Sequence, residues 1–454
     1  MRAPLLTLAL ASLLALPAAA QEPPATAQEP PASTQPAPPE GQDAETDASS
    51  AVPLEEISRF VLVFNAVRAG YVDEVGDHDL MQRAIRGLLL DLDPHSAYLQ
   101  RSDAEAFEEG TAGAYEGIGV EVMPLPDGSM RVIAPMDDSP AQRAGIRAGD
   151  VIVAVDGETL TPASHEGRGP LRGPPGTEVA VTVVREGEAA PLELRVARAV
   201  IRTPSVRGSI REPGLGQVRI AGFQADTASD FAATVDRLHR EAGGDGLRGL
   251  MIDLRSNPGG LLTSAVQIAD DLLDSGGIVS TRGRIRIGDT SFSATPGDRM
   301  RGRPVVVLVD AGSASASEVL AGALRDNRRA CVVGSRTFGK GSVQTVLPLD
   351  NGDAVKLTTA RYYTPDGTSI QARGIEPDLV LEGGAANGGF AEAALPGHLA
   401  ADGHEDGQPG QVLGGEKPVA QALAALRRLV SGGACAPPPE APEAPAAGDR
   451  PAGQ

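Results

Sequence analysis

The sequence predicts an α+β protein of several domains, one of which is a layered α/β core. Its 454 residues exceed the usual size of one domain. Beyond residue 200, runs such as Leu250–Arg255 and Val305–Val309 are typical of buried strands. Between such runs, Ala228–Ala242 carries apolar residues at helical spacing. Because strands and helices alternate, we expect residues 200–385 to form the layered core.

The first 20 residues have the pattern of a secretory signal peptide. Arg2 precedes an apolar stretch from Leu5 to Leu16, and Ala18–Ala20 form a small-residue cleavage site. An uncleaved membrane anchor is the alternative, but this apolar stretch is too short to span a bilayer comfortably. We therefore expect export and a mature chain that begins at Gln21.

Two segments of biased composition flank the expected domains. Residues 21–52 are rich in proline and alanine and are predicted to be a disordered linker. Residues 386–454 are predicted to be a C-terminal tail with one amphipathic helix at Pro418–Val430 and a disordered end.

Residues 53–102 are predicted to be a helical N-terminal segment. Apolar residues recur at helical spacing from Leu54 to Val67, and a second helix is expected at Leu80–Leu90. The following turn contains His95. Histidine is the most common general base, but this one lies in a turn and is one of six. We therefore interpret it as structural.

Residues 103–187 contain two segments that resemble a PDZ domain. Tyr115–Val120 reads Y-E-G-I-G-V, and Ser139–Ile152 reads S-P-A-Q-R-A-G-I-R-A-G-D-V-I. The resemblance implies that a peptide C-terminus binds to backbone N–H groups in the first segment while the next strand pairs with the peptide. The residues implied in this binding are Gly117, Ile118, Gly119 and Val120.

The PDZ resemblance has one departure. Where the helix that lines the peptide groove should lie, Ser164–Leu171 contains two glycines and a proline, which interrupt a helix. This predicts a shorter or looser groove. A β-rich domain without a ligand is the alternative interpretation.

The stretch from Val305 to Gln344 contains the residues best suited to catalysis. After the strand at Val305–Val309, three serines alternate with alanines in the sequence G-S-A-S-A-S-E, and a helix follows. Such a turn exposes a hydroxyl beside the free N–H groups of a helix N-terminus. A second strand, Ala330–Val333, leads into T-F-G-K-G at 337–341. A phosphate-binding loop is the alternative, but Gly341 stands where that motif needs Ser or Thr.

These two motifs together resemble the C-terminal processing proteases, also called tail-specific proteases. The resemblance covers residues 53–385 and implies a protease core of the ClpP/crotonase type. It implies that Ser315 is the nucleophile and Lys340, 25 residues later, is the base. A neutral lysine can take the proton of a serine hydroxyl. Gln344 matches the glutamine that orients the lysine. Asp326 matches a supporting aspartate of some members, although it could instead cap the helix or pair with Arg328 or Arg329.

The turn Asn257-Pro258-Gly259-Gly260 follows another buried strand. Glycines allow backbone N–H groups to approach a ligand closely, although a purely structural turn would also explain them. The resemblance implies an oxyanion hole formed by Ala316 and a glycine of this turn. We favour Gly259 over Gly260.

Composition excludes several other function classes. A net charge of −20 disfavours nucleic-acid binding. No cluster has the spacing of metal ligands, so no metal or cofactor is expected. The two cysteines, Cys331 and Cys435, are not expected to form a disulfide framework.

The sequence therefore predicts a periplasmic serine endopeptidase that cleaves polypeptides. A catalytically silent PDZ scaffold and an acyl hydrolase of a non-peptide substrate are the alternatives. The resemblance also implies self-association and, in some members, lipoprotein partners.

Overall fold

The computed structural model describes residues 52–165, 169–284, 289–381, 391–403 and 405–435. The predicted signal peptide, almost all of the predicted linker and the end of the predicted tail lie outside these ranges. The chain divides into two compact units, residues 1–74 and 75–454. In the first unit, α1 (Leu54–Gly70) confirms the predicted first helix. Its apolar side chains Leu54, Leu62 and Val63 are exposed.

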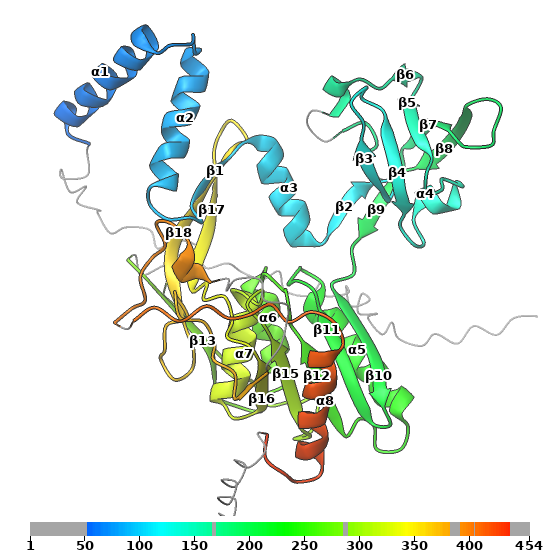
Figure 1. Cartoon of the computed structure of the whole chain (residues 1–454), viewed down its shortest axis with the longest axis vertical. Helices are drawn as coiled ribbons and strands as arrows, with labels where there is room; N and C mark the ends of the chain where they lie inside the picture. Colours follow the sequence, from blue (N-terminus) through cyan, green and yellow to red (C-terminus); the bar gives the residue numbers. More distant parts are fainter. Residues whose placement is uncertain (1–51, 166–168, 285–288, 382–390, 404, 436–454) are drawn as a thin grey trace, which may run out of the picture. The chain divides into compact units, whose positions relative to one another are not determined.

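The protease core contains a six-stranded sheet in the order β10-β11-β12-β15-β16-β19 (Figure 1). β10 and β11 are antiparallel, and the other neighbours are parallel. This arrangement confirms the predicted layered α/β core. The strands are β10 (Val206–Glu212), β11 (Leu215–Ile220), β12 (Gly249–Asp253), β15 (Val305–Val309), β16 (Ala330–Gly334) and β19 (Leu379–Val380).

Helices cover both faces of this sheet, which explains why its central strands β12, β15 and β16 are almost continuously apolar. In β15, Val305, Val307 and Val309 belong to the core shared with α5, α6 and α7. Val306 and Leu308 belong to the core shared with α8 on the other face. The helices are α5 (Thr227–Ala242), α6 (Leu262–Asp270), α7 (Ala316–Asp326) and α8 (Lys417–Val430).

A second sheet joins the segment before the PDZ region to the core. In it, β1 pairs with the long strand β18, which also pairs with β13 and β17. Ala97 in β1 lies opposite Lys356 in β18, and α2 (Asp77–Leu90) precedes β1. The strands are β1 (Ala97–Leu99), β13 (Gly277–Gly283), β14 (Thr290–Ser293), β17 (Ser342–Pro348) and β18 (Ala354–Tyr363).

The PDZ region forms its own sheet, in the order β3-β4-β5-β7-β8 with β6 beside β5. Its strands are β3 (Val120–Pro124), β4 (Met130–Pro135), β5 (Val151–Val155), β6 (Glu158–Thr159), β7 (Glu178–Val184) and β8 (Leu192–Ala197). Helix α3 (Arg101–Ala112) precedes β2 (Ala114–Gly117), which pairs with β9 (Ala199–Arg202). The short helix α4 (Pro140–Arg143) follows β4.

The sheet of the PDZ region extends past the boundary predicted at residue 187. β8 begins at Leu192 and pairs with β7 along its whole length. The glycine-containing turn between these two strands resembles a domain end in the sequence, but it is a hairpin turn. At the interrupted groove helix, the described residues form only the 3₁₀ turn η1 (Pro162–His165), as the glycines and the proline predict. Residues 166–168 lie outside the described ranges.

The C-terminal segment is more ordered than the predicted tail. Helix α8 packs on the core sheet, with Ala422, Ala425 and Leu426 fully buried. A disulfide joins Cys331 of β16 to Cys435, 104 residues later. The sequence predicted no disulfide framework, and the structure contains this single bond. The bond was not visible in the sequence, because the two cysteines are brought together by the packing of the segment after α8 near β16.

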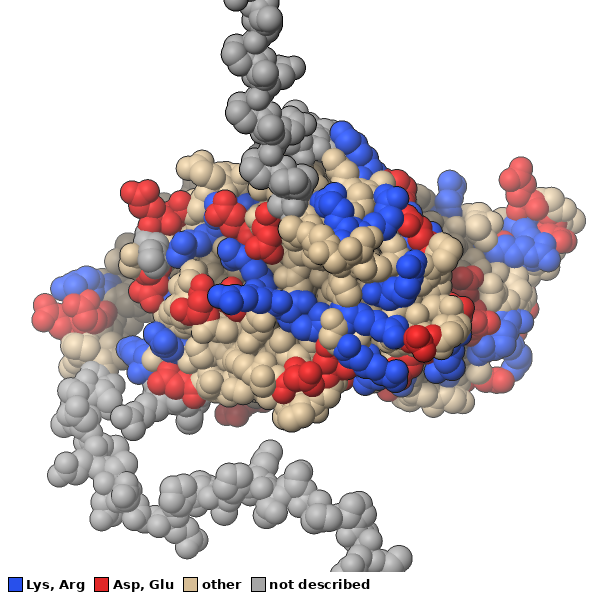
Figure 2. Space-filling model, turned by 90° about the horizontal axis from the view of Figure 1, so that it is seen from below, with Lys and Arg blue, Asp and Glu red and all other residues tan. Residues whose placement is uncertain are grey.

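The surface mixes charges of both signs. On the face in Figure 2, basic side chains form a band flanked by acidic ones. Arg299 pairs with Asp236 and Asp271, and Arg329 pairs with Asp298. Within the described ranges, no helix combines the length and apolar character needed to cross a lipid bilayer.

Candidate active site

Three loops meet because the strands before them are parallel neighbours. β12, β15 and β16 lie side by side in the sheet. The N-P-G-G turn follows β12, the serine loop follows β15, and the Phe338–Gly341 loop follows β16. The carboxyl ends of parallel neighbours share one edge of a sheet, where α/β proteins place their binding sites. Sequence motifs separated by many residues are thus brought to one edge.

The three serines of the serine loop differ in their hydrogen bonds. The Ser313 hydroxyl donates to the Leu254 carbonyl at 2.8 Å, and the Ser317 hydroxyl donates to the Asn257 carbonyl at 3.0 Å. Both serines are fully buried. The Ser315 oxygen faces the backbone N–H of Glu318 in a capping box, but within the described residues its hydroxyl donates to no acceptor. The loop therefore uses two serine hydroxyls to hold itself in place and leaves the proton of the middle one free.

The backbone at Ser315 is strained. Its φ of 55° and ψ of −114° lie in a region that residues with a side chain rarely adopt. Such strain persists only where surrounding contacts enforce it, and it is common at functional sites. Ser315 is also the N-cap of α7, so the N–H groups of that helix's first turn lie beside it.

The N-P-G-G turn lies directly against Ser315. A Cβ added to Gly259 would lie 2.9 Å from the Ser315 Cβ, so this close approach requires glycine. The Gly259 N–H donates to the Asn257 side chain at 2.9 Å. In the described part of the chain, the N–H groups of Gly260 and Ala316 have no acceptor. These two donors are therefore free, whereas the N–H of Gly259 is engaged.

Glu318, which the sequence analysis did not select, links the serine loop to the lysine loop. Its carboxylate is completely buried and accepts four hydrogen bonds. One comes from the N–H of Ser315 at 2.7 Å. The others come from the Thr337 hydroxyl and from the N–H groups of Gly339 and Lys340, at 2.5, 2.7 and 2.9 Å.

Burial raises the pKa of Glu318 to about 7, while its four donors act in the opposite direction. The sequence did contain a signal for this residue. Ser315-x-x-Glu318 has the capping-box spacing, and the carboxylate does accept from the N-cap N–H. Its contacts with the lysine loop were not visible in that spacing.

Lys340 lies half-buried after β16. Burial lowers its pKa below the usual lysine value, and the positive charge of Lys356 acts in the same direction. The carboxylates of Glu392, Glu318 and Asp93 partly oppose this shift. A lowered pKa is the property that a lysine needs to act as a base at moderate pH.

Gln344 lies in β17, close to the lysine loop in sequence. Its amide nitrogen donates to the Ser342 hydroxyl at 2.9 Å and to the Thr358 hydroxyl at 3.4 Å. Among the described residues, no hydrogen bond joins Gln344 to the Lys340 amine. The structure thus brings Gln344 to the neighbourhood of the lysine but directs its amide nitrogen to two hydroxyls.

Asp326 lies at the far end of α7 from Ser315. A helix rises about 1.5 Å per residue, so the two residues are roughly 16 Å apart along the axis. Asp326 accepts a hydrogen bond from the N–H of Asp366 at 3.3 Å, and burial raises its pKa. Within the described residues it pairs with neither Arg328 nor Arg329. Its contacts hold the turn before Asp366 rather than the serine loop.

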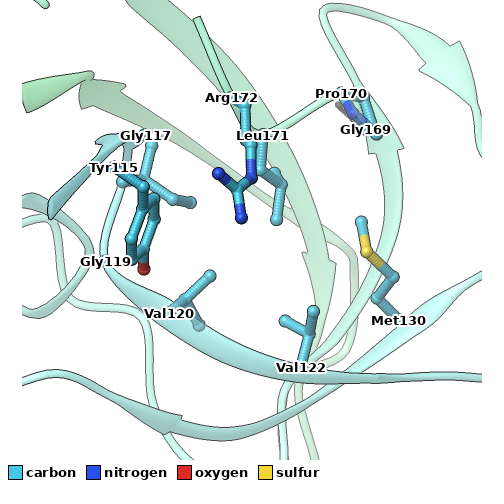
Figure 3. A pocket seen from close by; sticks show the side chains of 11 residues that line it. Tyr115, Gly117, Gly119, Val120, Val122, Met130, Gly169, Pro170, Leu171 and Arg172 are labelled. Carbon is cyan, nitrogen blue, oxygen red and sulfur yellow. The ribbon is translucent and has the colours of Figure 1, made fainter. Parts of the chain in front are cut away.

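A cavity of about 220 Å³ lies where the PDZ resemblance predicts a peptide groove (Figure 3). Gly117, Ile118, Gly119 and Val120 line it, as do Val122, Met130 and Leu171. Arg172, which the sequence analysis did not select, points into the cavity. Its guanidinium lies 4.6 Å from the centre of the Tyr115 ring and pairs with Glu109.

This fold and these sites define a serine-type hydrolase joined to a peptide-binding module. Comparison with known proteins gives the same two parts. Residues 214–381 match the model of peptidase family S41, and residues 131–185 match a PDZ domain. The chain belongs to peptidase family S41 and is a serine peptidase that acts on polypeptides, which confirms the predicted class and fold.

Two curated relatives and one solved structure illustrate the similarity. The carboxy-terminal-processing protease of Bartonella bacilliformis is 42% identical over 329 residues, covering 72% of this chain and 75% of the relative. The carboxy-terminal processing protease CtpA of Bacillus subtilis is 32% identical, with 70% and 67% coverage. A photosystem II D1 C-terminal processing protease is 33% identical, with 73% and 94% coverage and a TM-score of 0.41.

Proposed function

We propose that this peptidase is a C-terminal processing endopeptidase with Ser315 as nucleophile and Lys340 as base. The observation that carries the proposal is the difference among the three serines. The hydroxyls of Ser313 and Ser317 donate to buried carbonyls, whereas the hydroxyl of Ser315, on a strained N-cap, donates to no acceptor among the described residues. The lowered pKa of Lys340 supports its role as the base on the same edge of the sheet.

In the proposed reaction, the Ser315 oxygen attacks the carbonyl carbon of the scissile peptide bond. Neutral Lys340 takes the hydroxyl proton and later delivers it to the leaving amine, so an acyl-enzyme remains. Lys340 then takes a proton from water, whose oxygen attacks the ester. Collapse releases the carboxylic product and returns the proton to Ser315. The cycle needs no group beyond the chain and water.

The charge that develops on the substrate oxygen needs donors beside Ser315. Ala316 is one candidate, because its N–H follows the nucleophile and is unengaged. For the second donor we now favour Gly260 over Gly259, since the N–H of Gly259 already donates to Asn257. Donors placed for the oxyanion stabilise the tetrahedral intermediate more than the substrate. Gln344 and Asp326 have supporting roles at most in this scheme.

The cavity in the PDZ region is proposed to receive the substrate C-terminus. Its apolar walls suit an apolar terminal side chain, and Arg172 carries a positive charge that suits a carboxylate. A cavity that suits both an apolar side chain and a carboxylate supports recognition of polypeptides by their C-terminal ends rather than by an internal sequence.

A periplasmic location is proposed from the signal-peptide pattern of residues 1–20. The disulfide between Cys331 and Cys435 supports an oxidising compartment. Self-association and a lipoprotein partner remain predictions. The exposed apolar side chains of α1 would suit a protein partner.

Digestion of an unfolded protein by the wild-type and Ser315→Ala enzymes tests the proposal. We expect cleavage by the wild type alone, with equal amounts of folded protein. No cleavage by the wild type would favour the silent scaffold. Hydrolysis of small esters without cleavage of polypeptides would favour the acyl hydrolase. Equal cleavage by Ser315→Ala would remove Ser315 from the mechanism.

A further inference from the structure

The loop that carries Lys340 is held at both ends by one buried residue, Glu392. The N–H of Glu392 donates to the Phe338 carbonyl at 2.8 Å. Its carboxylate accepts from the side-chain amide of Gln371 at 3.1 Å. The carbonyl oxygen of that amide accepts from the Gly341 N–H at 3.1 Å. Glu392 therefore binds the loop on both sides of Lys340, directly at one end and through Gln371 at the other.

The same carboxylate of Glu392 also meets His95, from the turn before β1. The imidazole Nε2 lies 3.0 and 2.8 Å from the two carboxylate oxygens. Since an ionised carboxylate only accepts hydrogen bonds, Nε2 carries a proton in this arrangement. The Glu392 side chain is 1% exposed and that of His95 is 16% exposed. An acidic side chain buried to this degree is rare unless it is paired.

Both members of the pair lie outside residues 214–381, the part of the chain that matches the peptidase family model. They are separated by 297 residues in sequence. The turn that carries His95 is itself tied to β18, because the Thr358 N–H donates to the Ser96 hydroxyl at 3.1 Å. Segments from both sides of the family core thus converge on the lysine loop.

We propose that His95 and Glu392 are positioning residues. They hold the backbone of the Lys340 loop where the lysine amine can take the proton of Ser315. This inference rests on the proposed role of Lys340 as the base. Glu318 ties this loop to the serine loop, and the His95–Glu392–Gln371 chain ties it to the segments that flank the family core. A lysine amine at the end of a flexible side chain needs a fixed backbone to deliver its nitrogen repeatedly to one place.

The pair also contributes charge around the lysine. The groups that face Lys340 are Lys356 on β18, Glu318 on α7, Asp93 before β1 and Glu392 itself. The negative charge of Glu392 favours the ammonium form, so removing that charge should lower the pKa of Lys340 further. A residue that only stabilised the fold would not move the pKa of Lys340.

The test measures kcat and KM of the full-length enzyme on a peptide substrate across pH. For Glu392→Gln we expect kcat to fall on the order of tenfold or more, with KM little changed, because a charged hydrogen bond is lost. The acidic limb of the kcat/KM profile should move to lower pH. For His95→Ala we expect a similar fall in kcat. His95→Gln, which keeps an N–H donor, should recover most of it.

His398→Gln is the matched control. His398 also pairs with a carboxylate, Asp406, at 3.1 Å, and its other ring nitrogen contacts the Leu395 carbonyl. It lies in the same segment as Glu392 but makes no hydrogen bond to the Lys340 loop among the described residues. Its substitution should leave kcat and the position of the pH limb unchanged.

The Lys340→Ala variant distinguishes an error in the positioning role from an error in the proposed catalytic base. If Lys340→Ala is inactive while Glu392→Gln keeps the kcat and pH limb of the wild type, the positioning role is wrong. If Lys340→Ala remains active, the proposed base is wrong and the positioning role falls with it. If Glu392→Gln does not fold, the two His95 variants test the positioning role instead. Equal losses of kcat in His95→Ala and His95→Gln, or no loss in either, would contradict the proposal.

Discussion

The serine loop and the PDZ cavity are built in opposite ways. Around Ser315, the hydroxyls of Ser313 and Ser317 and the carboxylate of Glu318 are buried and hydrogen-bonded. The cavity beside Tyr115 is open, and strand residues and the Gly169–Arg172 loop line it. The catalytic loops are thus fixed by many contacts, whereas the peptide-recognition cavity is less constrained. Substitutions should therefore change kcat at the first site and KM at the second.

The largest expected effect is at the three serines. Ser315→Ala should abolish proteolysis and leave the fold intact, because the hydroxyl that it removes donates no hydrogen bond within the described residues. Ser313→Ala and Ser317→Ala should keep substantial activity but lose about 1–3 kcal/mol of unfolding free energy, since each removes a buried hydrogen bond that holds the loop. Peptide turnover and urea unfolding measure both effects. An inactive Ser317→Ala with an active Ser315→Ala would reverse the assignment.

Glu318→Gln should have the next largest effect. A carboxamide presents one acceptor oxygen, so it cannot accept the N–H groups of Ser315, Gly339 and Lys340 together. We expect kcat to fall on the order of a hundredfold through misplacement of the two loops. A kcat within twofold of the wild type would show that the buried carboxylate does not hold the loops in place.

Glu318 should also make stability depend on pH. The folded-state pKa of about 7 exceeds the ordinary value of 4.5, so the folded protein binds this proton more tightly than the unfolded chain. The contribution of this residue to unfolding free energy therefore falls as pH rises from 4.5 to about 7, and then levels off. Urea unfolding between pH 5 and 8 should show this decline in the wild type and lose it in Glu318→Gln.

The disulfide provides a smaller effect, on stability alone. Cys435→Ser should lower the unfolding free energy by about 2–4 kcal/mol in non-reducing buffer, because the bond closes a long loop in the unfolded chain. Reduction of the wild type should produce the same loss, and peptide turnover should be unchanged. A wild type whose unfolding midpoint is insensitive to reductant would show that the bond does not form in solution.

The smallest effect is expected in the PDZ cavity. Arg172→Ala should raise KM several-fold for substrates with a free, apolar C-terminus, less than the loss of a full charged hydrogen bond would, because Arg172 is already paired with Glu109. It should not change KM for the same peptide with an amidated C-terminus. Arg195→Ala, an exposed arginine of β8 outside the cavity, is the control. Equal effects of Arg172→Ala on both peptides would rule out carboxylate recognition.

Local patterns in the sequence predicted much of the fold. The strand at Val305–Val309 was predicted with its observed bounds, because burial on both faces requires an unbroken aliphatic run. Glycine and proline act through the backbone itself, and the described residues around the predicted break at Ser164–Leu171 form only a 3₁₀ turn. The boundary at residue 187 failed, since a hairpin turn and a domain end have similar composition.

The contacts that complete the site were beyond sequence reasoning. The partners of Glu318 lie 19 to 22 residues away in another loop, and only the adjacency of β15 and β16 brings them together. His95 and Glu392 are 297 residues apart, and Cys331 and Cys435 are 104 apart. Such pairs depend on tertiary packing, which leaves no periodic or local signal in the chain.

The most direct test of the central claim compares kcat/KM of the wild type and Lys340→Arg across pH. The claim is that a desolvated, neutral Lys340 activates Ser315. The wild-type value should rise with pH along a limb that lies below the ordinary lysine pKa of 10.5. Lys340→Arg should be nearly inactive at every pH, because a guanidinium stays protonated. Activity near that of the wild type in Lys340→Arg would contradict the account and leave Ser315 without a base.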